Sequence, residues 1–131
     1  MRFDGKVGLV TGAGSGIGRA TAIGFATRGG AVAVADINGE NANKVVAEIV
    51  AAGGKALAIV ADVTRPADID LMVSRTTSAF GRLDFLHNNA FGLPVAQATL
   101  VLLVHAGQQC RRNDRANVLP GYDGFRYHRT G

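Results

Sequence analysis

The sequence lacks the residues that mark disulfide-bonded, metal-binding and membrane-spanning proteins. Cys110 is the single cysteine among 131 residues, which excludes an internal disulfide and a cysteine-rich metal site. His87 has no partner at ligand spacing, so we interpret it as structural. The longest apolar stretch, at residues 98–106, is far shorter than the roughly 20 residues that a membrane span needs. The first residues include Asp4 and carry no apolar segment of the signal-peptide kind. We therefore expect a cytoplasmic location, no membrane contact and no bound metal.

Aromatic residues are also scarce. Tryptophan is absent, and Phe, Tyr and Trp together make up 6% of the chain. Small apolar residues take their place, because 47% of the residues are hydrophobic and 18 are glycine. Glycine is present at about twice its usual share, and many of the glycines separate one expected element from the next. Length and composition predict one α/β domain rich in Ala, Val and Gly.

Positive charge is concentrated near the carboxyl end. The formal net charge is +4, and residues 105–131 carry five Arg and two Asp. No lysine follows Lys55. Arg111, Arg112 and Arg115 are able to touch phosphates, but no nucleic-acid-binding motif surrounds them. Basic clusters of this kind are more often solvated surface, so we expect no nucleic-acid partner.

Up to about residue 88, short apolar runs alternate with helical patterns. Apolar residues recur at intervals of three and four in the helical segments, and glycines end these segments. The alternation predicts a parallel sheet covered by helices on both faces, and right-handed crossovers give the strand order 3-2-1-4. The predicted fold class is a doubly wound, Rossmann-like α/β fold truncated to about four strands. Strands are expected at about 6–11, 31–35, 56–61 and 83–87, and helices at about 16–28, 42–50 and 66–80.

A glycine-rich segment at residues 11–18 reads Thr-Gly-Ala-Gly-Ser-Gly-Ile-Gly and lies between the first expected strand and the first expected helix. Glycine lets the backbone turn tightly and bring its N–H groups against a pyrophosphate, whose charge a helix N-terminus favours. Ser15 adds a hydroxyl that can bond a phosphate or a ribose. The spacing of Gly12, Gly16 and Gly18 differs from the usual fingerprint. The strand, loop and helix context nevertheless predicts a dinucleotide-binding turn.

The regular pattern ends after Gly92. Residues 99–106 are compatible with either a short helix or a strand, and Pro120 and two nearby glycines interrupt any later periodicity. We expect residues 1–106 to form a dinucleotide-binding half-domain and residues 107–131 to form an irregular or disordered, Arg-rich tail.

The pattern Thr11-Gly12-x-x-x-Gly16-x-Gly18 resembles that of the short-chain dehydrogenase/reductase family. The resemblance runs in register from about residue 5 to residue 92. It includes Asn88-Asn89-Ala90-Phe91, where the family has Asn-Asn-Ala-Gly, so Phe91 replaces the usual glycine. The resemblance implies a nicotinamide cofactor and hydride transfer between that cofactor and an alcohol or ketone.

Asp36 ends the second expected strand, about twenty residues after the loop. A carboxylate there can accept hydrogen bonds from both hydroxyls of the adenosine ribose and would repel a 2′-phosphate. We therefore expect NAD in preference to NADP. Arg19 favours the opposite choice, but it lies inside the start of the helix. The alternative interpretation of Asp36 is a solvated carboxylate at a strand end.

Further contacts at the ends of the third and fourth strands are implied by the resemblance. Asp62 and Val63 would flank the adenine, and Asn89 would shape the cofactor floor beside Ala90. Asp62 has an alternative interpretation as a cap of the next helix, shared with Thr64. The candidate cofactor-binding residues are Gly12, Ser15, Gly16, Ile17, Gly18, Asp36, Ile37, Asp62, Val63, Asn89 and Ala90.

The catalytic residues that the resemblance implies are missing. Family enzymes use Ser and Tyr-x-x-x-Lys, in which lysine lowers the tyrosine pKa and tyrosine moves the proton. No serine follows Ser78, and the residue four positions after Tyr122 is Arg126 rather than lysine. Tyr127 has no lysine at that position either, and Asn117 matches the family's helix asparagine only faintly. We assign no catalytic residue.

Three functional hypotheses stay open at this point. The chain is an NAD-dependent short-chain oxidoreductase in a truncated, catalytically impaired form, or it is a non-catalytic NAD-binding module. The third hypothesis is an unstable fragment or interaction protein that oligomerises through an exposed strand edge at residues 83–87. A frameshifted or prematurely ended gene product would also join a matching first part to an unrelated tail. Reading the coding DNA in the other frames past codon 92 tests that origin.

Overall fold

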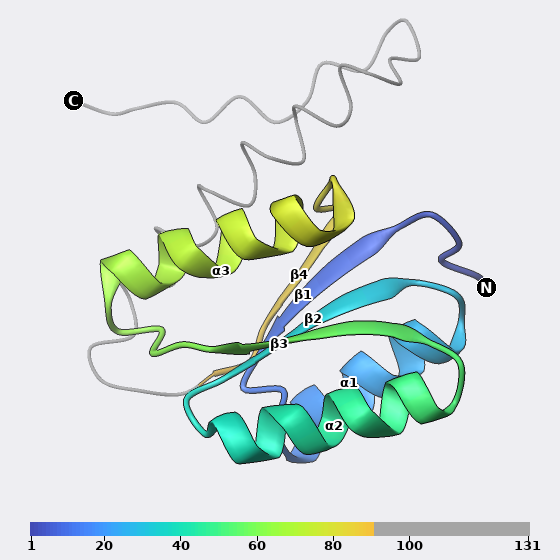
Figure 1. Ribbon diagram of the computed structural model, residues 1–131, viewed down its shortest axis with the longest axis horizontal. Helices are drawn as coiled ribbons and strands as arrows, with labels where there is room; N and C mark the ends of the chain where they lie inside the picture. The colour runs from blue at the N-terminus through green and yellow to red at the C-terminus, as the bar shows by residue number, and fades with distance from the viewer. Residues whose placement is uncertain (91–131) are drawn as a thin grey trace, which may run out of the picture.

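The computed structural model describes residues 1–90, which form one parallel sheet with helices on both faces (Figure 1). The segments expected at residues 99–106 and 107–131 lie outside the described residues. The sheet has the order β3-β2-β1-β4 with parallel pairing throughout, as the sequence predicts. The elements are β1 (Val7–Thr11), α1 (Gly16–Thr27), β2 (Ala31–Asp36), α2 (Gly39–Ala51), β3 (Lys55–Val60), α3 (Pro66–Phe80) and β4 (Phe85–Asn88).

The strands are apolar on both faces because both faces are covered by helices. Leu9 of β1 packs into the core under α3, whereas its neighbour Val10 packs into the core under α1 and α2. Residues of β2 alternate in the same way, with Ala33 on the α3 side and Val34 on the other. The two hydrophobic layers fix the strand register, and with it the position of every strand end.

An aromatic cluster closes the end of the sheet where the strands begin. Phe25 of α1 stacks on Phe3 with ring centroids 4.6 Å apart and meets Phe85 of β4 edge to face at 5.5 Å. Two glycines make room for it. A Cβ at Gly30 would lie 2.2 Å from the Phe25 ring, and one at Gly8 would lie 3.2 Å from it. Phe85 is therefore anchored on one side, although it is 47% exposed.

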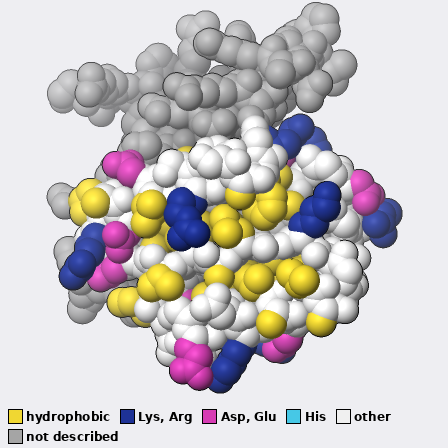
Figure 2. Space-filling model, in the orientation of Figure 1, with side chains coloured by type: hydrophobic (Ala, Val, Ile, Leu, Met, Phe, Trp, Pro, Cys, Tyr) yellow, Lys and Arg dark blue, Asp and Glu magenta, His cyan; other side chains and the backbone are white. Residues whose placement is uncertain are grey.

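The fourth strand differs in part from the sequence-based expectation. Within residues 1–90, β4 lies at the edge of the sheet, as the sequence predicts, but Leu83 precedes the strand and its side chain is fully buried under α3. The strand starts at Phe85, directly after Asp84, which bonds the start of β1. Val50, near the end of α2, is 54% exposed. Val60, in the edge strand β3, is 56% exposed. Figure 2 shows one face of the molecule, on which apolar side chains lie among Lys and Arg side chains.

Asp84 ties the start of β4 to the start of β1. Its N–H donates to the carbonyl of Val7 at 2.8 Å, and its carboxylate accepts from the Val7 N–H at 2.9 Å. Arg82 donates to both oxygens of the same carboxylate, at 2.8 and 2.7 Å. Burial alone would raise the pKa of Asp84, but the hydrogen bonds from Arg82 and Val7 outweigh it and hold that pKa below its ordinary value.

Asp84→Asn is expected to lower the free energy of unfolding by about 1–2 kcal/mol at pH 7, because charge-assisted hydrogen bonds are lost. Since the folded-state pKa is lowered from 3.8, the carboxylate stabilises the fold above about pH 4, and this contribution disappears as the pH falls through the folded-state pKa. The difference in the free energy of unfolding between the wild-type protein and Asp84→Asn should therefore become smaller below about pH 4. Urea unfolding followed by circular dichroism at pH 7 and pH 3 measures it, and an undiminished difference at pH 3 would contradict the assignment.

Candidate functional site

An open pocket of about 800 Å³ lies where the carboxyl ends of the strands meet. Ligands of open α/β sheets bind at this edge. The pocket brings together every candidate cofactor-binding residue except Gly18, although these residues are spread over 78 positions of sequence. The lining residues are Gly12, Ser15, Gly16, Ile17, Ala35, Asp36, Ile37, Ala61, Asp62, Val63, Thr64, Asn89 and Ala90.

The glycine-rich loop between β1 and α1 forms one wall of the pocket. Gly12 and Gly16 have φ of 62° and 56°, a left-handed conformation that favours glycine. Ser15 is the N-cap residue of α1, yet its hydroxyl makes no capping hydrogen bond. The first N–H groups of a helix have no partner within the helix. In α1 they belong to residues at the pocket wall, beginning with Gly16 and Ile17. Within residues 1–90, the loop therefore offers the first N–H groups of α1 and the hydroxyl of Ser15 to the pocket.

Gly18 does not line the pocket but packs behind the loop. A Cβ at Gly18 would lie 2.3 Å from the carbonyl oxygen of Gly12 and 2.8 Å from Nδ2 of Asn89. No side chain fits between those atoms. Gly18 is therefore needed for the close approach of α1 to the loop, rather than for a direct ligand contact.

The carboxylate of Asp36 is held by two backbone amides. Its Oδ2 accepts from the N–H of Gly14 at 2.8 Å, and its Oδ1 accepts from the N–H of Asn38 at 2.9 Å. Gly14 sits so close that a Cβ there would lie 2.8 Å from the same Oδ2. Sequence reasoning missed this role of Gly14, for which the extra glycine in the loop was the only signal. Asp36 is thus oriented at the pocket wall, not merely solvated.

Thr11, at the end of β1, fixes the opposite wall. Its Oγ1 accepts from the N–H groups of Asn89 and Ala90, each at 3.0 Å, and donates to Oδ1 of Asn88 at 3.3 Å. Nδ2 of Asn89 donates to the carbonyl of Gly12 at 3.4 Å. Thr11 is fully buried. The candidate set omitted it, although its place at the start of the motif was a signal.

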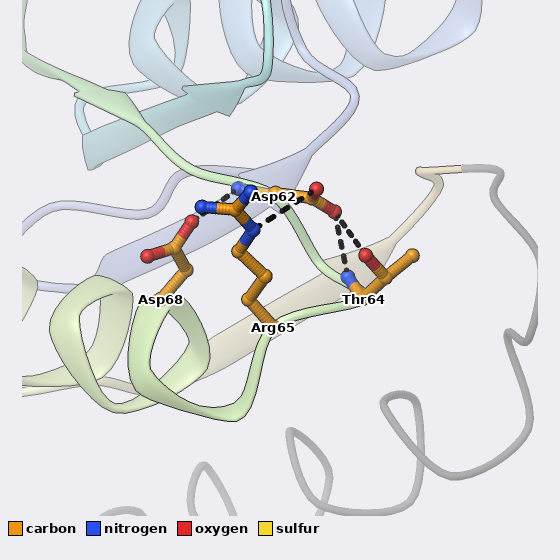
Figure 3. A network of polar contacts seen from close by, with 4 residues as sticks. All are labelled: Asp62, Thr64, Arg65 and Asp68. Atoms are coloured by element: carbon orange, nitrogen blue, oxygen red, sulfur yellow. Dashed lines mark hydrogen bonds and ion pairs between the residues drawn. The ribbon is translucent and has the colours of Figure 1, made fainter.

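The loop between β3 and α3 carries Asp62 (Figure 3). Oδ1 of Asp62 accepts from the N–H and the hydroxyl of Thr64, at 2.9 and 2.6 Å. These bonds lower the pKa of Asp62. Asp62 makes no side-chain cap for α3, whose N-cap residue is Arg65 without a capping side-chain bond. The sequence's alternative of a helix cap is therefore wrong, whereas the pairing with Thr64 is present.

Exposed apolar side chains stand at the pocket rim. Ile17 and Ile37 are 73% and 70% exposed, and both line the pocket. Residues 1–90 contain no group of three or more His, Cys, Asp or Glu side chains placed to hold a metal ion. Within the same residues, no helix is long and apolar enough to cross a membrane. Tyr122, Arg126 and Asn117 lie outside the described part of the chain.

The strand order, the crossovers and the glycine-rich loop define a Rossmann-like, nucleotide-binding α/β fold. Residues 6–108 match the family model of the short chain dehydrogenases. The chain belongs to this family.

Its relatives are oxidoreductases. It is 52% identical over 89 residues to cyclohexanol dehydrogenase of Acinetobacter sp. (strain SE19), covering 68% of this chain and 36% of that protein. It is 46% identical over 92 residues to 7alpha-hydroxysteroid dehydrogenase of Escherichia coli (strain K12), covering 70% of this chain and 36% of that protein. The chain thus spans about a third of the length of these curated relatives.

Solved structures give the same result. A hydroxysteroid dehydrogenase from Escherichia coli superposes with a TM-score of 0.81 at 35% identity, covering 86% of this chain and 55% of that one. A 7α-hydroxysteroid dehydrogenase in complex with NADH and 7-oxo glycochenodeoxycholic acid also gives a TM-score of 0.81 at 35% identity, covering 86% and 51%. That protein binds a nicotinamide cofactor.

Proposed function

We propose that the pocket at the strand ends binds NAD(H). The observation that carries this proposal is the Asp36 carboxylate, which two backbone amides hold beside the open N-terminus of α1. A helix N-terminus favours the charge of a diphosphate, and a fixed carboxylate accepts from the two hydroxyls of the adjoining ribose. The same pocket therefore offers hydrogen-bond donors at the N-terminus of α1 and a hydrogen-bond acceptor at the end of β2.

The remaining lining residues are assigned by the chemistry of the ligand. The diphosphate lies against Gly12, Ser15 and Gly16, and Gly18 keeps that loop closed. The adenine lies between the apolar side chains of Ile37 and Val63, with Asp62 toward its amino group. The nicotinamide end lies toward Ile17, Asn89 and Ala90. Residues 1–90 supply the cofactor half of the site.

NAD is preferred to NADP because residues 1–90 offer a 2′-phosphate no positive charge in the pocket. None of the lining residues in this part of the chain is Lys or Arg, and the carboxylate of Asp36 would repel the phosphate. Arg19, the residue that argued for NADP, forms an ion pair with Glu48 of α2 and does not line the pocket. Its charge is engaged elsewhere on the surface.

The proposed reaction class is hydride transfer between NAD(H) and an alcohol or ketone. Residues 1–90 contain no tyrosine, so a tyrosine that moves the proton has to come from another segment. The sequence contains no Tyr-x-x-x-Lys, and loss of a general acid typically costs about 10²–10⁴ in rate. We therefore propose cofactor binding with impaired turnover. Oxidation of a panel of secondary alcohols, followed by NADH absorbance, separates the impaired enzyme from a non-catalytic NAD-binding module.

Asp36→Ala is expected to weaken NADH binding about tenfold, because the ribose loses a charged acceptor. NADPH binding should be unchanged or stronger, because a repulsive charge is removed. Titration of each nucleotide by its own fluorescence or by calorimetry measures both affinities.

The matched control is Glu40→Gln, which removes one exposed negative charge from the first turn of α2, where it pairs with Lys44. It should change either affinity less than about twofold, as exposed ion pairs contribute little. Absence of NADH binding by the wild-type chain would overturn the proposed function. Equal losses for Asp36→Ala and Glu40→Gln would overturn the role of Asp36.

A further inference from the structure

The two oxygens of the Asp62 carboxylate are in different situations. Oδ1 accepts two hydrogen bonds from Thr64, one from its N–H and one from its hydroxyl. Within residues 1–90, Oδ2 accepts no hydrogen bond and has only Nε of Arg65 nearby, at 3.8 Å (Figure 3). Thr64 has thus saturated one oxygen and left the other available.

The backbone beneath this carboxylate is fixed as well. Oδ2 of Asp68, in the first turn of α3, accepts from the N–H of Asp62 at 2.9 Å. The N–H of Arg65 donates to the carbonyl of Asp62 at 3.0 Å. Since the main chain is held on both sides, the direction of the Asp62 side chain depends chiefly on its bonds to Thr64. The Asp62 side chain is 27% exposed, and both residues line the pocket.

We propose that Thr64 is a positioning residue that turns Asp62 Oδ2 into a single, fixed acceptor, which selects a nucleotide whose base carries an amino group at this place. This inference rests on the proposed binding of NAD(H). A carboxylate can only accept hydrogen bonds when it is ionised. The 6-amino group of adenine donates to it, whereas the 6-oxo group of hypoxanthine would face it with a lone pair.

The hydroxyl of Thr64 is the part of the arrangement that a substitution can remove selectively. Thr64→Val keeps the shape of the side chain and the backbone N–H bond, but it loses the 2.6 Å bond from Oγ1 to Oδ1. The carboxylate is then free to turn toward the exposed guanidinium of Arg65. Thr64→Ser restores the hydroxyl and should restore the selection.

The experiment uses the full chain with two probes, NADH and reduced nicotinamide hypoxanthine dinucleotide. The wild-type protein should bind NADH about tenfold more tightly than the hypoxanthine analogue, the ratio expected for one well-placed hydrogen bond. Thr64→Val should reduce this ratio to about threefold or less by weakening the binding of NADH alone. Thr64→Ser should keep the ratio at its wild-type value. Thr77→Val is the matched control, because Oγ1 of Thr77 bonds only main-chain carbonyls of its own helix. It should leave the ratio unchanged.

The outcomes separate this inference from the function on which it rests. The positioning role is wrong if Thr64→Val lowers the affinities for NADH and the hypoxanthine analogue by the same factor, or leaves the ratio of the two affinities at its wild-type value. NAD(H) binding would stand in either case. If the wild-type chain binds neither nucleotide, both the proposed function and the inference fail. Should Thr64→Val not fold by circular dichroism, Thr64→Ala carries the same comparison, since it also removes the hydroxyl and adds no bulk.

Discussion

Gly18→Ala should reduce NADH affinity about a hundredfold and lower the free energy of unfolding by about 1–3 kcal/mol. The added methyl carbon would lie 2.3 Å from the carbonyl oxygen of Gly12 and 2.8 Å from Nδ2 of Asn89. The first of these atoms belongs to the main chain, so it cannot rotate away. The loop has to move off α1, which separates the two walls of the pocket and breaks the bond between Asn89 and Gly12.

Gly24→Ala is the matched control in the same helix. Among residues 1–90, and apart from the backbone of α1 itself, its Cβ would meet only Nη1 of Arg28, at an ordinary contact distance of 3.5 Å. Replacing a glycine inside a helix by alanine typically stabilises by about 0.5–1 kcal/mol. Thermal unfolding and NADH titration of both variants test the pair. NADH affinity at the wild-type level in Gly18→Ala would show that the close packing behind the loop is dispensable.

Thr11→Val is expected to destabilise the fold by about 2–4 kcal/mol. Valine has nearly the same volume as threonine but no oxygen, so the part-buried N–H groups of Asn89 and Ala90 lose their acceptor beside the buried side chain. A buried donor left unpaired costs about 1–3 kcal/mol, and Asn88 also loses a donor. The floor of the pocket should loosen together with the fold.

Thr11→Ser separates the hydroxyl from the methyl group. It keeps all three hydrogen bonds, so it should cost no more than about 1.5 kcal/mol, a value typical for one lost buried methyl. Urea unfolding of the three proteins, followed by circular dichroism, gives the two differences. If valine were tolerated as well as serine, the hydroxyl would not be what joins β1 to β4.

The strand order and the pocket were predictable because they depend on pattern. Apolar runs of strand length between helical patterns define parallel crossovers, and handedness then leaves one arrangement. Once that order is known, Gly12, Asp36, Asp62 and Asn89 all fall at the same edge of the sheet. Their proximity follows from topology without any knowledge of side-chain contacts.

The details that the sequence did not predict depend on contacts between distant residues. Leu83 reads as the first residue of an apolar strand, but its side chain is buried under α3, Asp84 bonds Val7, and the strand begins two residues later. The two acceptor bonds of Thr11 cross 78 and 79 positions of sequence. Thr64 was read only as part of a cap, because its bonds to Asp62 depend on how the loop turns. No local pattern encodes such pairs.

The pairing of β1 with β4 has a consequence for the order of folding. Val7 of β1 pairs with Ala31, 24 positions later, whereas Gly8 pairs with Phe85, 77 positions later. Closing the longer loop costs about 1 kcal/mol more chain entropy than closing the shorter one. The fourth strand should therefore dock last, and Asn89 and Ala90 reach the cavity only at that step. Nucleotide capture would then report that β4 of a newly made chain has docked on β1.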